Sequence, residues 1–231
     1  MALIIPILIA VLGGLVMMLV STRVSARQLD AQSRPLTDPK LLHLTDRMAR
    51  ELGVGELQVF VQNISTINGL AAPDGRVFIT RGFMEKYRAG QVQAEEIASV
   101  IAHELGHVAL GHSQRRMIDY TGQNAIRMAL MLMVGRVVPI VGPWLIGMLT
   151  QLLAARLSRR DEYEADAYAA ALLTKIGVGI GPQRSLFRKL DHLAGGTNGT
   201  PAWLMSHPKA EERVAAIEAL SRAWNTRPVM R

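Results

Sequence analysis

The sequence predicts a mainly helical fold with a small β-sheet (α+β), preceded by an N-terminal transmembrane helix. An uncharged apolar run, Ala2–Val20, is about as long as a helix must be to cross a bilayer. Two short strand-like stretches lie near each other within residues 57–80. Most of the remaining chain repeats apolar residues at helical spacing. We therefore divide the chain into an anchor (1–22), a polar linker (23–37) and one folded domain (38–231).

The composition favours contact with a membrane. The 231 residues suffice for one well-packed domain, and 49% of them are hydrophobic, including twelve methionines. The net charge of +7 comes mainly from scattered arginines and not from a basic block interleaved with aromatic residues. This pattern is typical of attraction to a membrane surface and argues against nucleic-acid binding. The chain has no cysteine, which excludes disulfides and thiolate metal ligands.

The N-terminal apolar run has two interpretations. As an uncleaved anchor it makes a single-pass protein of the cell (inner) membrane, with the folded domain in the cytoplasm because Arg23, Arg27 and Arg34 follow the run. As a cleaved signal peptide, residues 1–26 would send the domain to the periplasm or outside the cell. Val24-Ser25-Ala26 resembles a cleavage site, but the charge at Arg23 and the lack of Lys or Arg before the run favour the anchor.

The first part of the domain combines helix and strand signals. Asp38 is a helix cap, apolar residues follow it at helical spacing, and Gly53 ends that helix. Residues 57–61 and 76–80 are rich in β-branched and aromatic side chains and predict two strands, joined by a turn-rich loop. A short helix is expected over 81–87.

The second part of the domain is predicted to be helical. Apolar spacing and Gly/Pro breaks give helices over 95–112, 125–155, 158–176, 183–193 and 209–224. The helix 158–176 begins with a run of acidic residues, whereas 125–155 is strongly apolar.

His103, Glu104 and His107 form the pattern H-E-x-x-H inside the helix predicted over 95–112. Residues four apart lie on one face of a helix, so both imidazoles can hold one metal ion, with Glu104 beside them to act on a water molecule. This pattern is the zinc-peptidase signature and predicts one Zn²⁺ per chain. The alternative is that two core histidines happen to lie four residues apart.

The third metal ligand is expected on the acidic helix, because a catalytic zinc usually has three protein ligands. Glu162 and Asp166 are four apart and share a face, whereas Glu164 points elsewhere. We predict that Glu162 binds the metal and that Asp166 accepts a hydrogen bond from the far nitrogen of a zinc-bound histidine. The alternative is a solvated acidic face.

The two motifs together resemble a known family. The H-E-x-x-H at 103–107 and the E-x-x-A-D at 162–166 are similar to those of the gluzincin zinc metallopeptidases typified by HtpX, BepA and the CAAX prenyl protease. Residues 68–82 look like the active-site strand segment of that family, and Ser206-His207-Pro208 with Arg213 looks like its C-terminal element. The resemblance covers roughly residues 38–220. It implies a gluzincin-type domain with zinc endopeptidase activity, in protein processing or quality control at the membrane.

The resemblance also implies roles for residues outside the two motifs. Arg159 lies three residues before Glu162, as the arginine of the family does, and is expected to support the metal ligands, as is Arg213. His207 is our candidate for stabilising the oxyanion together with zinc, and Arg213 is a second candidate. The alternative is a histidine in a turn and an arginine on a helix surface. His112 lies off the ligand face, and we interpret it as structural or as a support for a ligand.

The expected substrate is a protein or peptide that lies extended along the strand at 76–80 and pairs with its backbone. The residues of this strand are Arg76, Val77, Phe78, Ile79 and Thr80. Zinc makes its bound water more acidic, and Glu104 would take the proton and pass it to the leaving amine. The alternative function is a metal-stabilised, membrane-anchored chaperone or scaffold with little or no proteolysis, although a protein of that kind has no need of Glu104.

The apolar segment 125–155 lies between the predicted ligands His107 and Glu162, which constrains its course. One membrane crossing would put the ligands on opposite sides of the bilayer. Val137–Ala155 is long enough for one crossing, but the piece before it is too short for a second and carries Arg127. We therefore expect 125–155 to be helical, to cover part of the active site, and to dip into the membrane surface without spanning it.

Overall fold

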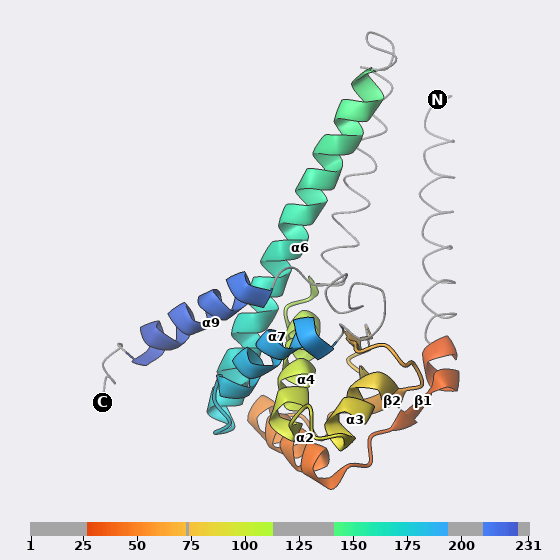
Figure 1. Cartoon of the computed structure of the whole chain (residues 1–231), viewed down its shortest axis with the longest axis vertical. Coiled ribbons are helices and arrows are strands. Elements are labelled where there is room, and N and C mark those ends of the chain that lie inside the picture. Colours follow the sequence, from red (N-terminus) through yellow and green to blue (C-terminus); the bar gives the residue numbers. More distant parts are fainter. Residues whose placement is uncertain (1–26, 73, 113–140, 194–209, 226–231) are drawn as a thin grey trace.

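The computed structural model of the chain describes residues 27–72, 74–112, 141–193 and 210–225 (Figure 1). The predicted anchor and His207 lie outside these residues, as does the first half of the apolar segment 125–155. Within the described parts, the fold is mainly helical with one four-stranded sheet, as predicted. None of the helices in these parts combines the length and the apolar character that a membrane crossing needs.

The sheet has the strand order β1-β2-β4-β3. Its strands are β1 (Ser33–Pro35), β2 (Val59–Gln62), β3 (Gly69–Ala71) and β4 (Val77–Thr80). β2 and β4 correspond to the two predicted strands and pair in parallel, whereas β1 pairs antiparallel with β2 and β3 antiparallel with β4. β1 lies in the stretch predicted as linker, and β3 lies in the stretch predicted as a turn-rich loop.

Local hydrogen bonds and backbone conformation set the ends of the helices around the sheet. In α2 (Pro39–Leu52), the Asp38 carboxylate accepts from the backbone N–H groups of Lys40 and Leu41, both at 3.1 Å, and Gly53 adopts a left-handed conformation that ends the helix. Both ends were predicted. The short helix α3 (Arg81–Arg88) follows β4 directly, as expected.

A single helix, α6 (Val141–Lys175), replaces the two helices predicted on either side of residue 156. The apolar stretch and the acidic stretch therefore form one continuous element of 35 residues. Figure 1 shows the first half of α6 projecting beyond the sheet and the other labelled helices, while its second half packs against them. The helicity expected over 125–155 is confirmed for 141–155.

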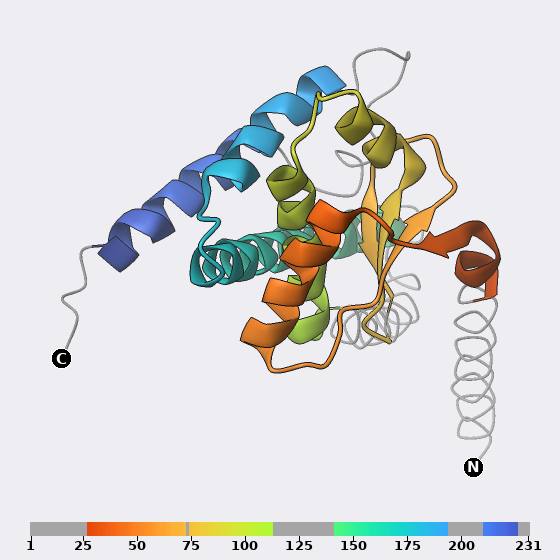
Figure 2. The same ribbon diagram turned by 90° about the horizontal axis from the view of Figure 1, so that it is seen from below.

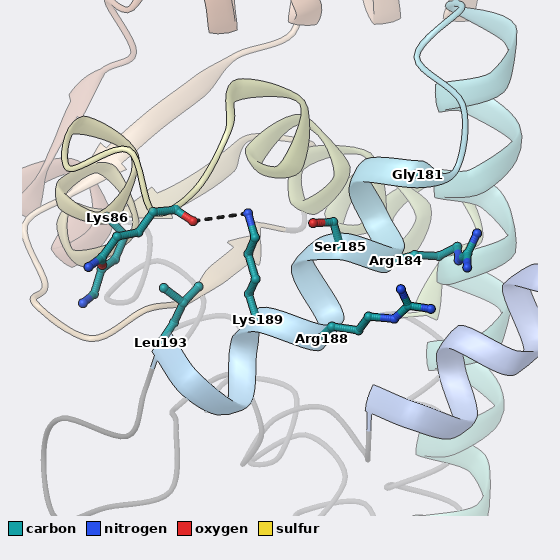
Figure 3. Close-up of a pocket in the computed structure, with 8 residues that line it drawn as sticks. Lys86, Gly181, Arg184, Ser185, Arg188, Lys189 and Leu193 are labelled. Atoms are coloured by element: carbon teal, nitrogen blue, oxygen red, sulfur yellow. Dashed lines mark hydrogen bonds between the residues drawn. The ribbon is translucent and has the colours of Figure 1, made fainter.

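Two helices complete the domain, α7 (Gly181–Leu193) and α9 (Ala210–Asn225). Arg184 and Arg188 of α7 both pair with Glu218 of α9, and Lys189 pairs at 2.7 Å with Glu96 of the helix α4 (Ala94–Ala109). These cations line an open groove of about 660 Å³, where Lys189 also donates to the carbonyl of Gln91 (Figure 3). The first two ion pairs therefore join α7 to α9, and the third joins α7 to α4.

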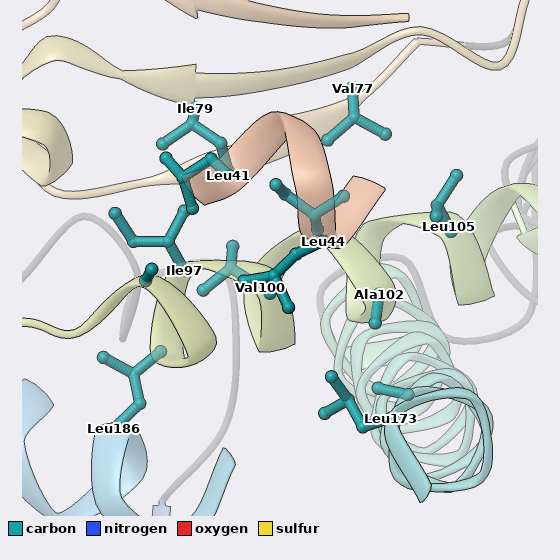
Figure 4. Packing of buried hydrophobic residues seen from close by; sticks show 14 of the residues in the cluster. Leu41, Leu44, Val77, Ile79, Ile97, Val100, Ala102, Leu105, Leu173 and Leu186 are labelled. Carbon is teal, nitrogen blue, oxygen red and sulfur yellow. The ribbon is translucent and has the colours of Figure 1, made fainter. Parts of the chain in front are cut away.

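The core is centred on α4 (Ala94–Ala109), which Figure 2 shows between the sheet on one side and α7 and α9 on the other. In Figure 4, Ile97 and Val100 of α4 lie below Leu41, Leu44, Val77 and Ile79, while Leu173 of α6 and Leu186 of α7 approach from the opposite side. All of these side chains are buried. Because both sides of α4 are covered, its polar side chains are also held in fixed positions.

Candidate metal centre

The two histidines of the H-E-x-x-H pattern lie in the last two turns of α4. Their exposed fractions are 2% for His103 and 8% for His107. Because they are four residues apart on one helix, their rings come together, with 3.1 Å between the two Nε2 atoms. Buried imidazoles that direct the same nitrogen to one point are the arrangement that a metal ion requires.

Glu162 of α6 completes the set from the opposite side. Its Oε2 lies 3.3 Å from Nε2 of His103, and its Oε1 lies 3.4 Å from Nε2 of His107. Zinc binds nitrogen and oxygen at about 2.0–2.1 Å in tetrahedral geometry, which places neighbouring ligand atoms about 3.3–3.4 Å apart. The observed separations of 3.1, 3.3 and 3.4 Å therefore fit a zinc ion.

Close packing between α4 and α6 brings Glu162 to the histidines. Gly106 of α4 lies directly against Ala165 of α6, so that a Cβ on Gly106 would be 3.0 Å from the Cα of Ala165 and 3.2 Å from the Cβ of Tyr168. Two small residues thus let the helix backbones approach at the level of the candidate metal ligands. This is the physical reason for the glycine in H-E-L-G-H and the alanine in E-Y-E-A-D.

Gly106→Leu is expected to weaken both folding and zinc binding. The added side chain would have to push α6 away, at a cost of about 1–3 kcal/mol of unfolding free energy, and Glu162 would move with α6. Ala109→Leu is the matched control, because Ala109 lies on the exposed side of the same helix. Denaturant unfolding and zinc titration of both variants measure the two effects. Equal zinc affinity in both variants would show that the helix spacing does not control the site.

Asp166 supports His103 from the same helix as Glu162. Its Oδ1 lies 2.9 Å from Nδ1 of His103, and Arg213 of α9 donates to both carboxylate oxygens at 2.6 Å. Burial alone would raise the pKa of Asp166, but Arg213 and His103 hold it below its ordinary value. Burial likewise lowers the pKa of His103, yet its hydrogen bonds to Asp166 and Glu162 raise it to about 9.

Arg213 is 1% exposed and lies over the ring of Phe187, 4.4 Å from the centroid. The alternative interpretation, an arginine on a helix surface, is therefore wrong. Its guanidinium uses Nε and one terminal nitrogen on Asp166. This pairing commits Arg213 to fixing a carboxylate and does not leave those donors free for an oxyanion.

Glu104 occupies a buried position beside the two histidines. It is 4% exposed, and its Oε1 has no hydrogen-bond partner among the described residues. Burial raises its pKa to about 7; His103 and the backbone N–H of Ala71 oppose this rise, whereas Glu162 adds to it. Gly69 of β3 lets this strand approach α4 beside Glu104, since a Cβ there would lie only 2.7 Å from Cγ1 of Val100, whereas its distance of 3.5 Å to Oε1 would be an ordinary contact. A group of this kind can accept and release a proton near neutral pH.

The other predicted site residues occupy different surroundings. Glu164 points away from the ligands and lies 3.2 Å from Nε2 of His112. Arg159 is exposed and lines a shallow hollow between α6 and α9, which also includes Tyr163 and Glu212. His207 lies outside the described residues, so its oxyanion role stays a prediction.

The strand predicted to bind substrate cannot pair with it. β4 is interior, because β2 occupies one of its edges and β3 the other along its whole length. Its backbone groups are therefore already hydrogen-bonded, and the pairing expected at Arg76–Thr80 is wrong. Within the described residues, the free edge nearest to Glu104 belongs to β3.

Three structural contributions were missed by reasoning from the sequence. They are the helix contact of Gly106 with Ala165, the close approach of β3 to α4 at Gly69 beside Glu104, and the hydrogen bond between His107 and His112. Glycine within strongly patterned segments was the signal available for the first two. No comparable signal marks the third, because it depends on a turn after α4.

The chain matches the family model for peptidase family M48 over residues 35–221. It is 32% identical to metalloprotease LoiP of Escherichia coli K12, over 65% of this chain and 57% of LoiP. It is 33% identical to metalloprotease YcaL of the same strain, over 66% of this chain and 58% of YcaL. Protease HtpX of Pseudomonas putida W619 is 26% identical over 82% of this chain and 74% of HtpX.

The chain thus spans less than two thirds of the length of each of the two Escherichia coli relatives. The family match, in contrast, covers β2, β3 and β4, the helix α4, the candidate ligand Glu162 on α6, and Arg213. The H-E-x-x-H at 103–107, the E-x-x-A-D at 162–166 and the buried Arg213 all lie within the matched range. The chain belongs to peptidase family M48.

Proposed function

We propose that this protein is a membrane-anchored, zinc-dependent endopeptidase. The observation that carries the proposal is the convergence of His103, His107 and Glu162, whose ligand atoms lie 3.1–3.4 Å apart beside the buried Glu104. Two imidazoles and one carboxylate are the ligand set of many zinc peptidases. The names of the M48 relatives, metalloprotease and protease, agree with this chemistry.

The residues of the site have different roles in peptide hydrolysis. Zinc, when bound, supplies a Lewis acid that polarises the scissile carbonyl and makes water acidic enough to react at neutral pH. Glu104 takes a proton from the attacking water and delivers it to the leaving amine, so that one residue acts first as a base and then as an acid. Asp166 and Arg213 hold His103 in place during both steps.

The substrate is proposed to lie along the free edge of β3. The Asn68 carbonyl accepts from Thr80 of β4, and the Ala72 N–H donates to the carbonyl of Arg76, directly before β4. Alternation therefore directs the backbone groups of Gly69 and Ala71 to the other side. The backbone of Ala71 lies close enough to Glu104 to lower the pKa of its carboxyl, which places this edge next to the base. An extended peptide that pairs here is recognised through its backbone, and such recognition suits the clearance or processing of many different proteins.

His207 is proposed to stabilise the oxyanion. His207→Phe is then expected to lower kcat by about 10²–10³-fold while changing KM much less, because the lost interaction forms only in the transition state. Steady-state kinetics on a fluorogenic peptide, with zinc content measured on the same sample, tests this. Unchanged kinetics would make His207 an ordinary turn residue.

The membrane location rests on the sequence of Ala2–Val20 and the arginines after it. We place the catalytic domain in the cytoplasm; a periplasmic or secreted domain follows if residues 1–26 are cleaved. Accessibility of a tag after Arg231 in intact cells separates these locations. A tag that can be reached from outside would overturn the cytoplasmic orientation.

Cleavage of casein by the purified full-length chain tests the proposed activity. We expect cleavage with added zinc, its loss with a chelator, and its return when zinc is restored. The second candidate, a metal-stabilised chaperone or scaffold, predicts zinc binding and suppression of client aggregation without fragments. Terminal sequencing of fragments that accumulate in cells only with the active enzyme would then identify substrates.

A further inference from the structure

The second zinc ligand, His107, has an imidazole behind it. Its Nδ1 lies 2.9 Å from Nδ1 of His112, and the two rings meet edge to face with centroids 5.0 Å apart. His112 is 1% exposed. It is five residues after His107 and would not reach it on a continued helix. α4 ends at Ala109, and Gly111, with φ of +66°, turns the chain so that His112 folds back beneath the ligand.

The far side of His112 faces carboxylates from α6. Its Nε2 lies 3.2 Å from Oε2 of Glu164 and 3.9 Å from Oδ1 of Asp161. Asp161 is buried, and the Glu164 carboxylate is held in addition by Arg160, at 2.8 Å. His112 therefore lies between a metal ligand and a fixed negative charge, and both of its ring nitrogens have a partner.

His107, His112 and the carboxylates of α6 form a row of hydrogen-bonded groups. Donor and acceptor chemistry allows the hydrogen bonds of this row to run in only one direction. If Nε2 of His107 presents its lone pair to the metal, the proton of that ring must be on Nδ1. Nδ1 of His112 must then accept, so the proton of His112 is on Nε2 and points to Glu164 or Asp161. Every hydrogen bond in the row runs from the ligand towards the carboxylates, and this polarity makes His107 a better electron donor.

We propose that His112 is a positioning residue for the metal ligand His107, which it fixes in the Nδ1–H tautomer by accepting its proton. This inference rests on the zinc site of the proposed function. The centre is then supported in two ways. Asp166 accepts a hydrogen bond from His103 directly, whereas His112 accepts one from His107 and in turn donates to the carboxylates on α6.

The experiment compares the full-length wild type with His112→Phe and His112→Asn. Phenylalanine fills the space but accepts no hydrogen bond, whereas the Asn side chain carries an oxygen close to the position of Nδ1. In competition with a chelating dye, His112→Phe should bind zinc about 10–100-fold more weakly than the wild type, and His112→Asn should recover most of that loss. Thermal unfolding of the zinc-free proteins measures any effect on the fold separately.

Equal zinc affinity of His112→Phe and wild type would overturn the inference while leaving the proposed function intact. Equal loss in both variants would also overturn it, because the acceptor of His112→Asn would then have no effect. A wild type that binds no zinc would overturn the inference and the proposed function together. Nitrogen NMR of the zinc-loaded wild type is a further measurement that needs no variant: His112 must carry its proton on Nε2, and a proton on Nδ1 would contradict the proposal.

Discussion

Glu104→Gln is expected to abolish peptide cleavage while the protein still binds one zinc ion. Gln has the shape of Glu but cannot take a proton from water, and general-base catalysis contributes about 10²–10⁴-fold to rates of this kind. None of the three predicted ligands is altered, so the metal content should not change. The buried position of Glu104 makes the comparison sharp, because the substitution keeps the volume of a closely packed site.

The measurement is casein or fluorogenic-peptide cleavage at saturating zinc, with metal content determined on the same preparation. Glu95→Gln is the matched control, since it removes a carboxylate from the same helix at an exposed position. The control should retain the activity of the wild type. If Glu104→Gln carried zinc and cleaved as fast as the wild type, Glu104 would not be the base, and the mechanism proposed above would be wrong.

The parts of the fold that could be predicted are those with strong local signals. Asp38 and Gly53 mark the ends of α2 because a cap side chain and a left-handed glycine are local requirements. The spacing of His103 and His107 similarly predicts a shared face on any helix. The same argument separated Glu162, which faces the histidines, from Glu164, which faces His112.

The parts that could not be predicted depend on contacts between distant segments. β1 and β3 have three residues each, too few for an alternating pattern, and they exist because longer strands beside them offer backbone partners. β4 is interior because β3 pairs with its second edge. The residues of β3 were predicted to be part of a loop, so that edge of β4 was wrongly expected to be available for substrate. The burial of Arg213 depends on α7 and α9 meeting, which composition does not reveal.

The end of α4 shows how a local detail can change a site. Apolar spacing predicted a helix up to His112, and on such a helix His112 would point away from the ligands. The structure ends α4 at Ala109 and turns at Gly111. Only the three-dimensional arrangement shows that the turn returns an imidazole to His107.

Glu162→Ala is expected to lose zinc, and Glu164→Ala is expected to keep it. The two glutamates are two residues apart on α6 and thus point in different directions. The carboxylate of Glu162 lies 3.3 and 3.4 Å from the two ligand nitrogens, whereas that of Glu164 pairs with Arg160 and His112. Removing one side chain empties a ligand position, and removing the other leaves all three in place.

The expected losses of zinc affinity differ enough between the Glu162 and Glu164 variants to distinguish the two glutamates. Loss of a direct ligand should weaken zinc binding by more than the roughly 10–100-fold that the loss of an outer hydrogen-bond partner costs. Glu164→Ala should remain within about tenfold of the wild type, because Asp161 still lies near His112. Glu162→Gln, which keeps the volume of a side chain that is 1% exposed, is a further variant should Glu162→Ala fold poorly.

Metal analysis after dialysis and competition with a chelating dye, on folded samples checked by circular dichroism, decide between the two glutamates. Zinc retained by both Glu162→Ala and Glu162→Gln but lost from Glu164→Ala would transfer the ligand role to Glu164. That result would place the metal nearer to His112 and Asp161, which with Glu164 form the other described group of side chains close enough to hold an ion. Because Glu162 faces the two nitrogens proposed to bind zinc, and Glu164 faces an imidazole that already contacts His107, we expect the loss of zinc to follow Glu162.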